Sequence, residues 1–180
     1  NAAWTHPVIY QRLQQAKKLR PHMQTVVIDP RKTATCEEAD LYLGIAPGTD
    51  AFLFNGLLAY LAQENALDHS FILNHSNQFD ETLQQAFAGL DDTADVVKST
   101  AKVCDISEST LLRFFQLFKE HQHTVTLYSQ GVNQSSSGVD KCNAIINCHL
   151  ATGRIGQPGM GPFSLTGQPN AMGGREVGGL

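Results

Sequence analysis

The stretch HTVTLYSQGVNQSSSGVDKCNAIINCHLATG, residues 123–153, holds a complete strand–loop–helix unit. Its first part, Thr124–Ser129, is rich in β-branched and aromatic residues, which predicts a strand. A polar loop, QGVNQSSSG, follows this strand, and Val139–Thr152 is expected to form a helix. Beyond Gly153 glycine and proline are frequent and no apolar period recurs, so the remainder is expected to be loop.

Two earlier segments show the same order of elements. Gln24–Asp29, QTVVID, is a short β-branched run stopped by a proline, which predicts a buried strand. A second strand is expected at Leu41–Ile45, followed by a Pro-Gly turn and a helix over Ala51–Glu64. Strands that alternate with helices imply an α/β fold, with a mostly parallel sheet and helices on both of its faces.

Further segments have the apolar spacing of helices. One helix is expected to begin at Pro7, with Thr5 as a possible N-cap, and to end near Lys18. The clearest helix follows Ser107, its expected cap, and has a buried apolar stripe formed by Ile106, Leu111, Phe114, Phe115 and Phe118. Short helices are expected at Ser70–His75, Asp80–Ala88 and Thr93–Val103.

Composition excludes several classes of function. The chain has 180 residues, 42% apolar and 17% charged, which is typical of one globular domain. A net charge of −4 without basic clusters argues against nucleic acid as a partner, and no apolar run is long enough for a membrane span. The amino terminus does not resemble a signal peptide, and a start at Asn indicates a processed chain or an internal fragment.

The cysteines and histidines form no recognisable metal-binding motif. Cys36, Cys104, Cys142 and Cys148 lie far apart and give no CxxC, which disfavours a zinc or iron–sulfur site within this chain. Free thiols in a reducing, cytoplasmic environment are the simpler interpretation. No HExxH or GxSxG occurs, so the chain carries neither a zinc protease motif nor a nucleophile elbow.

Three polar segments follow the expected strands, where ligands bind in parallel sheets. In DPRKT, Asp29 can accept ribose hydroxyls and Arg31 can bind a phosphate or stack on a base. APGTD opens a helix, whose first amides favour an anion, and SQGVNQ offers amide side chains to a base. A solvated turn, an ordinary N-cap and a polar turn explain the same segments equally well. Since no GxGxxG or P-loop occurs, these loops fit a nucleotide held without a glycine fingerprint.

Four segments resemble the catalytic subunits of bacterial nitrate reductases, in the molybdopterin oxidoreductase family. They are NAAWTHP, VVIDPRKTAT, ADLYLGIAPGTDAFLFNGLL and the highly specific final segment, residues 129–180. The resemblance is strongest to the cytoplasmic, assimilatory branch and weakest over residues 65–102. It implies a Rossmann-like dinucleotide-binding domain over residues 1–153 and a truncated loop toward the active site over 154–180. The implied cofactors are a molybdenum bis(molybdopterin guanine dinucleotide) and, in the full-length protein, a [4Fe–4S] cluster.

The resemblance also assigns roles to residues. Those expected to contact the pterin dinucleotide are Asn1, Ala2, Trp4, Asp29, Arg31, Thr33, Gly48, Thr49, Asp50, Gln130, Gly131, Gln134 and Gln168. Arg175, in the segment GGREVG, is expected to face the substrate nitrate beside the molybdenum. The implied reaction is the reduction of nitrate to nitrite, with electrons supplied by a donor protein or subunit.

The chain also departs from the family pattern. It lacks the cysteine set for the [4Fe–4S] cluster, the cysteine that ligates molybdenum, and the carboxy-terminal domain that completes the second dinucleotide site. No metal ligand is therefore expected within this chain, and the fragment alone is expected to be inactive. Two alternatives stay open: a formate dehydrogenase-like molybdoenzyme, although REVG favours nitrate, and a nucleotide-binding module without a redox role.

Overall fold

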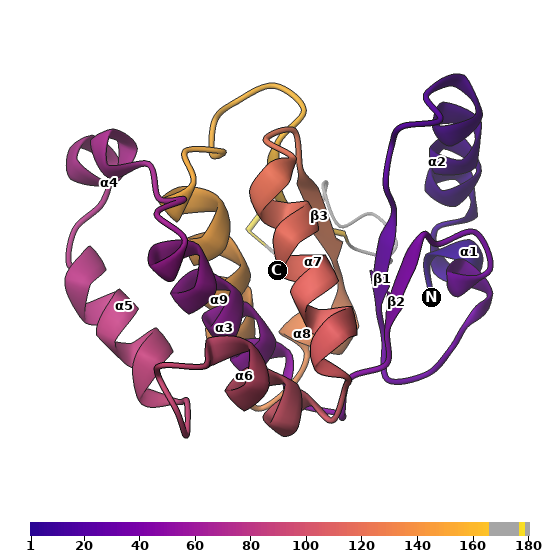
Figure 1. Cartoon of the computed structure of the whole chain (residues 1–180). Helices are drawn as coiled ribbons and strands as arrows, with labels where there is room; N and C mark the ends of the chain where they lie inside the picture. The colour runs from indigo at the N-terminus through magenta and orange to yellow at the C-terminus, as the bar shows by residue number, and fades with distance from the viewer. Residues whose placement is uncertain (166–176, 179–180) are drawn as a thin grey trace.

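The computed structural model describes residues 1–165 and 177–178, and within them the strands form two parallel pairs (Figure 1). β1 (Val26–Ile28) pairs with β2 (Leu41–Leu43), with Val26 opposite Leu41. β3 (Val125–Tyr128) pairs with β4 (Gly161–Ser164), with Val125 opposite Gly161. The expected mixture of helices and parallel strands is confirmed, but the described strands form two separate sheets instead of one.

The expectation of helices on both sheet faces is wrong for β3. Its side chains alternate between exposed and half-buried positions, with Val125 and Leu127 about two-fifths exposed at 44% and 40%. Thr126, on the other face, bonds to His149 of α9 (Gly138–Ala151). The described helices therefore cover one face of this sheet and leave an apolar row on the other face in contact with solvent.

The core is centred on α3 (Asp50–Gln63), which is buried nearly all round. Its residues Leu53, Leu57, Leu58 and Leu61 are at most 1% exposed, as expected for a helix surrounded by other elements. α3 packs most extensively against α9 and next against α6 (Val96–Cys104). Gly56 allows α3 to approach α6, because a Cβ at this position would collide with the side chain of Thr100.

α7 (Glu108–Glu120) confirms the clearest prediction from the sequence. The Ser107 hydroxyl accepts a hydrogen bond from the Thr110 amide at 3.2 Å and so caps the helix. The apolar stripe is buried at Leu111, Phe114, Phe115 and Phe118, while Ile106 is only partly buried at its edge. α4 (His69–His75), α5 (Phe79–Ala88) and α6 lie where short helices were expected.

The amino-terminal helices differ in detail from expectation. α2 (Pro7–Leu19) begins at Pro7, as expected, but its N-cap position is His6 and not Thr5. The Thr5 hydroxyl bonds instead to the carbonyl of Asn1, within a short preceding helix, α1 (Ala2–Thr5). A one-turn 3-10 helix, η1 (Ala34–Cys36), lies between β1 and β2.

Two segments expected to be loop contain regular structure. The polar segment after β3 forms a short helix, α8 (Gln130–Asn133). The Gly/Pro-rich segment after α9 contains β4, whose sequence GPFS has no strand pattern of its own. The Gly161 amide donates to the Thr124 carbonyl at 3.0 Å, so pairing with β3 supplies the order that local propensity does not.

Among the described residues, no helix is long and apolar enough to cross a membrane. All four cysteines are free thiols, as expected. Cys148 lies fully buried on α9, where its thiol contacts the carbonyl of Phe54 at 3.1 Å. Burial raises the pKa of the Cys148 thiol and holds the pKa of Cys104 at about 11, so both stay protonated near neutral pH.

A buried cation, Arg154, fixes the passage from α9 toward β4. It is 1% exposed, lies 4.1 Å above the ring of Phe118, and donates to the carbonyls of Phe118 and His121 at 2.6 and 3.1 Å. These carbonyls end α7, where a cation is favoured by the helix dipole. Arg154 therefore links the end of α7 to the chain just after α9.

His149, next to this cation, is fully buried and neutral. Its Nε2 lies 2.7 Å from the Thr126 hydroxyl, and its ring packs edge-on against Phe118. Burial, with a smaller contribution from the Arg154 charge, lowers the pKa of His149 from 6.5 to about 3. Protonation of this ring would place a second positive charge in the same buried cluster.

We expect this histidine to make the protein acid-sensitive. Because the folded pKa of about 3 lies below the ordinary 6.5, stability is full above pH 6.5 and falls as the pH drops from 6.5 toward 3. The free energy of unfolding should fall by up to about 1.4 kcal/mol per pH unit in this window. His149→Gln should flatten the dependence in thermal unfolding measured from pH 7 to 4, whereas His123→Gln, on the surface, should leave the slope unchanged.

Candidate functional site

The carboxyl ends of β1 and β2 meet at one edge of their sheet, which we call the strand-exit edge. Asp29 is the first residue beyond β1, and its amide donates to the carbonyl of Leu43, the last residue of β2, at 3.2 Å. The Tyr42 hydroxyl donates to the Asp29 carbonyl at 2.9 Å and holds the turn against β2. The parallel pairing therefore places Asp29 where strand-exit ligands bind.

The chain's first residues reach this edge through Thr35. Its hydroxyl donates to the Asn1 side-chain oxygen at 3.1 Å and accepts from the Ala3 amide at 3.0 Å. The backbone nitrogen of Asn1 lies 3.9 Å from the Asp29 carboxylate. The structure thus brings together two segments, 1–4 and 29–35, in which the sequence predicted contacts to the same ligand.

The predicted residues in these two segments differ in accessibility. Trp4 is 76% exposed and Arg31 is exposed, so both side chains are available to a ligand. One oxygen of Asp29 accepts the Arg31 amide at 2.8 Å, which fixes the turn and leaves the other carboxylate oxygen nearer Asn1. Thr33 is only 8% exposed, with its hydroxyl 3.9 Å from the Cys36 sulfur, so its side chain faces inward.

The second group of predicted residues begins α3. Gly48 has a φ of +90°, which favours glycine, and a Cβ there would meet nothing within 4 Å. The Thr49 hydroxyl donates to the Ala46 carbonyl at 2.7 Å and does not cap the helix. The Asp50 carboxylate, in the first turn of α3, forms an ion pair with Lys141 of α9 at 2.8 Å.

The third group lies on α8 and at its C-cap, Gln134, between β3 and α9. Gln130, Gly131 and Gln134 are exposed, and a Cβ at Gly131 would project into open space. α8 is tied to the end of β4, because the side-chain Nδ2 of Asn133 donates to the Ser164 hydroxyl at 3.3 Å. Gly138 lets α8 lie close to the start of α9, since a Cβ there would collide with the Asn133 carbonyl.

The three groups lie where strands give way to helices. Leu43 is opposite Ile28 and accepts the Asp29 amide, and the chain reaches Gly48 five residues after Leu43. α3 and α9 lie side by side and run in the same direction (Figure 1). Their first turns meet at the Asp50–Lys141 pair, and further along Cys148 of α9 contacts Phe54 of α3. Two 14-residue helices thus begin side by side, α3 after β2 and α9 after β3 and α8.

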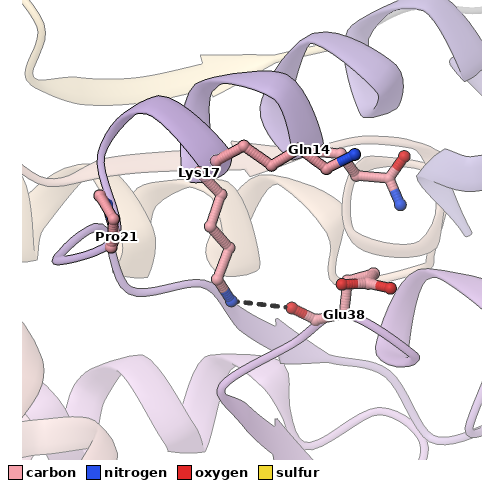
Figure 2. A pocket seen from close by; sticks show the side chains of 5 residues that line it. Gln14, Lys17, Pro21 and Glu38 are labelled. Atoms are coloured by element: carbon pink, nitrogen blue, oxygen red, sulfur yellow. Dashed lines mark hydrogen bonds between the residues drawn. The ribbon is translucent and has the colours of Figure 1, made fainter.

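A separate open depression of about 380 Å³ lies away from this edge, between α2 and the segment before β2 (Figure 2). Its central lysine, Lys17, bonds to the Thr25 hydroxyl, the Glu38 carbonyl and the Asp40 carboxylate at 2.7–3.2 Å. Burial disfavours the charged form of Asp40, but bonds from Lys17 and Thr25 outweigh it and lower its pKa. These bonds join Lys17 of α2 to the segments that precede β1 and β2.

Sequence reasoning missed two residues, Thr35 at the strand-exit edge and Lys141 on α9. The only sequence feature that could have indicated Thr35 is a hydroxyl group close to DPRKT, and Thr33 has the same feature. Lys141 has a stronger signal, since a lysine in the first turn of a helix opposes the helix dipole. Gln168 and Arg175 lie outside the described residues, so the structure does not test them. No group of three potential metal ligands occurs among the residues that are described.

The geometry defines an α/β protein with polar segments directly after β1, β2 and β3. Residues 1–180 match the molybdopterin oxidoreductase family, and the chain belongs to that family. It is 52% identical over 180 residues to nitrate reductases of Klebsiella oxytoca and Shewanella frigidimarina, covering all of this chain and 20% and 19% of theirs. The chain therefore spans about a fifth of the length of these relatives.

More distant relatives bear other names. The assimilatory nitrate reductase catalytic subunit of Bacillus subtilis is 33% identical, over 99% of this chain and 24% of its own length. The alpha subunit of an F420-dependent formate dehydrogenase from Methanocaldococcus jannaschii is 31% identical, over 97% and 25%. Acetylene hydratase from Pelobacter acetylenicus shares the fold with a TM-score of 0.60 at 21% identity, over 78% of this chain and 18% of that one.

We expect Gly138→Ala to destabilise the protein by about 1–3 kcal/mol, because the new methyl group would push α8 away from α9 against a backbone carbonyl. The midpoint of thermal unfolding should fall. Gly131→Ala is the matched control, since its methyl group would meet open space and should leave the midpoint unchanged. Equal midpoints for both variants would contradict a tight α8–α9 contact.

Proposed function

We propose that this chain is part of a molybdenum-dependent nitrate reductase and supplies much of the binding site for one molybdopterin guanine dinucleotide. The observation that carries the proposal is the convergence of Asn1, Asp29 and Thr35 beyond β1, together with family membership over the whole chain. Nitrate reductases at 52% identity favour nitrate as the substrate of the whole enzyme.

The chemistry of the described residues fits a nucleotide group. Asp29 Oδ2, the oxygen that does not accept the Arg31 amide, can accept hydrogen bonds from ribose hydroxyls. The exposed Arg31 can bind a phosphate or stack on a base. Gly48 and Gly131 leave open space where a Cβ would otherwise stand, so a ligand can approach the backbone closely. The exposed amides of Gln130 and Gln134 suit the polar edge of a pterin or a base.

The two long helices add a general preference for an anion at this edge. α3 and α9 begin side by side, so the partial positive charges of their first turns lie close together. A pyrophosphate placed near these turns would be stabilised without a GxGxxG loop. When bound, the molybdenum cofactor would supply the oxygen-transfer and redox chemistry, and this chain's residues would bind and orient its nucleotide end.

Assimilation, a cytoplasmic location and a [4Fe–4S] cluster in the whole protein belong to the same proposal. The Bacillus subtilis relative is named as an assimilatory enzyme, which supports the first of these. Formate dehydrogenase chemistry is the second candidate, because a relative of that name matches 97% of this chain. The segment REVG, residues 175–178, favours nitrate, and a nucleotide-binding module without redox activity is the third candidate.

We predict that Asp29→Ala in the full-length protein weakens cofactor retention and leaves the chemistry of turnover unchanged. Loss of the carboxylate would leave the ribose hydroxyls without a partner, at a cost on the order of 1–3 kcal/mol. The measurements are pterin and molybdenum content per protein, and activity per bound molybdenum. Asp91→Ala, whose carboxylate is 65% exposed and pairs with Lys102, is the control. Full cofactor content in Asp29→Ala would make Asp29 a plain turn residue.

We predict that Arg175→Lys raises KM for nitrate and lowers kcat/KM by roughly ten- to a thousandfold. A guanidinium can bind two nitrate oxygens in parallel and so direct the third toward the metal, whereas an ammonium acts as a point charge. Steady-state kinetics with nitrate provide the measurement, and molybdenum content should not change. Wild-type kinetics in this variant would show that Arg175 does not face the substrate.

A further inference from the structure

Lys141 occupies a position that disfavours a cation in two ways. It is only 4% exposed, and burial of an ammonium group costs free energy unless the group is paired. It is also the fourth residue of α9, where the positive end of the helix dipole repels it. A lysine at such a position needs a specific partner to be stable there.

Asp50 is that partner, and the geometry of the pair is asymmetric. Lys141 Nζ lies 2.8 Å from Asp50 Oδ2, with the lysine side chain 5% exposed and the aspartate side chain 18% exposed. The Lys141 side chain is therefore buried more deeply than the Asp50 side chain, which is partly accessible to solvent. Among the described residues, no hydrogen bond to Asp50 Oδ1 is found, so this oxygen can accept one from outside the fold.

Three other lysine–carboxylate pairs occur among the described residues, and each lysine in them is more exposed than Lys141. Lys17–Asp40 is half-buried, at 24% and 28%. Lys102–Asp91 is exposed on both sides, at 74% and 65%, and Lys119–Glu64 is exposed at 33% and 42%. Such pairs contribute little and do not fix a side chain strongly. In the Lys141–Asp50 pair the lysine is buried at 5% and the aspartate is 18% exposed, and the pair joins the first turns of α3 and α9.

We propose that Lys141 is a positioning residue for the nucleotide site, a role that rests on the proposed function. Lys141 holds the Asp50 carboxylate in one orientation, so that Oδ1 accepts an N–H or O–H group of the bound nucleotide. The lysine does not touch the nucleotide, and it acts only through Asp50.

The test measures the nucleotide itself, as GMP released by acid hydrolysis per mole of purified full-length protein. Lys141→Met should lower the GMP content after dialysis by roughly 10-fold, the usual scale for losing a group that orients a ligand-binding residue. Asp50→Asn should give a similar loss, and the double variant Lys141→Met/Asp50→Asn should lose no more than either single variant. Lys141→Arg should retain most of the GMP, and Lys102→Met should retain all of it.

A further variant separates positioning from folding. Lys141→Met/Asp50→Leu replaces the buried ion pair by apolar side chains, which usually keeps a protein folded. We expect its thermal midpoint to approach that of the wild type while its GMP content stays low. Recovery of full GMP content in this variant would overturn the proposal, because the pair would then be purely structural.

The remaining outcomes distinguish this inference from the proposed function. Full GMP content in Lys141→Met together with loss in Asp50→Asn would overturn the role of Lys141 and leave the nucleotide site intact. Full GMP content in both would overturn the role of Lys141 and the assignment of Asp50. Wild-type protein that releases no GMP at all would overturn the proposed guanine dinucleotide site itself.

Discussion

The packing of α3 against α9 is the constraint on which the rest of the structure depends. α3 is apolar nearly all round, and it buries its leucines between α9 on one side and α5, α6 and α7 on others. Because the two helices run in the same direction, their first turns are brought together and so are the loops that precede them. The closeness of the Asp50 and Lys141 segments therefore follows from the burial of apolar surface, whereas hydrogen bonds of Thr35 and Tyr42 hold the strand-exit edge.

Buried polar contacts then fix details that apolar packing leaves free. Leucine and phenylalanine side chains would tolerate small rotations of one helix about the other, because the hydrophobic effect has no direction. Arg154 binds the last carbonyls of α7, His149 bonds to Thr126 of β3, and Lys141 binds Asp50. Each of these bonds joins two elements, and losing one partner would leave the other buried and unsatisfied. They select one arrangement among those that bury similar apolar area.

Features of the fold that depend on one segment of the sequence could be predicted, and features that depend on contacts between distant segments could not. α7 was predictable because Ser107 and the stripe from Leu111 to Phe118 act within one helix, and the strands near Val26 and Val125 carry local β-branched runs. β4 was not predictable, since GPFS becomes a strand only through pairing with residues 36 positions earlier in the chain. The two-sheet arrangement and the exposed face of β3 were missed for the same reason: neighbours in space decide them. In the site, the strand exits could be located from the sequence, but the inward-facing Thr33 and the ion pair of Asp50 depend on tertiary contacts.

Under the proposed function, the segments after β1, β2 and β3 would form a nucleotide site without a glycine fingerprint. A GxGxxG loop provides a tight turn, close approach of the backbone to a pyrophosphate, and close packing of the helix on the strand. Here three separate glycines fit these tasks: Gly48 provides the left-handed turn, Gly131 the open backbone, and Gly138 the close packing of α8 on α9. They come from two strand–helix units, and α3 and α9 each contribute a first turn. Neither loop has a recognisable motif by itself, because residues of both units would contribute to the site. The packing of α3 on α9 brings the first turns of these two helices together.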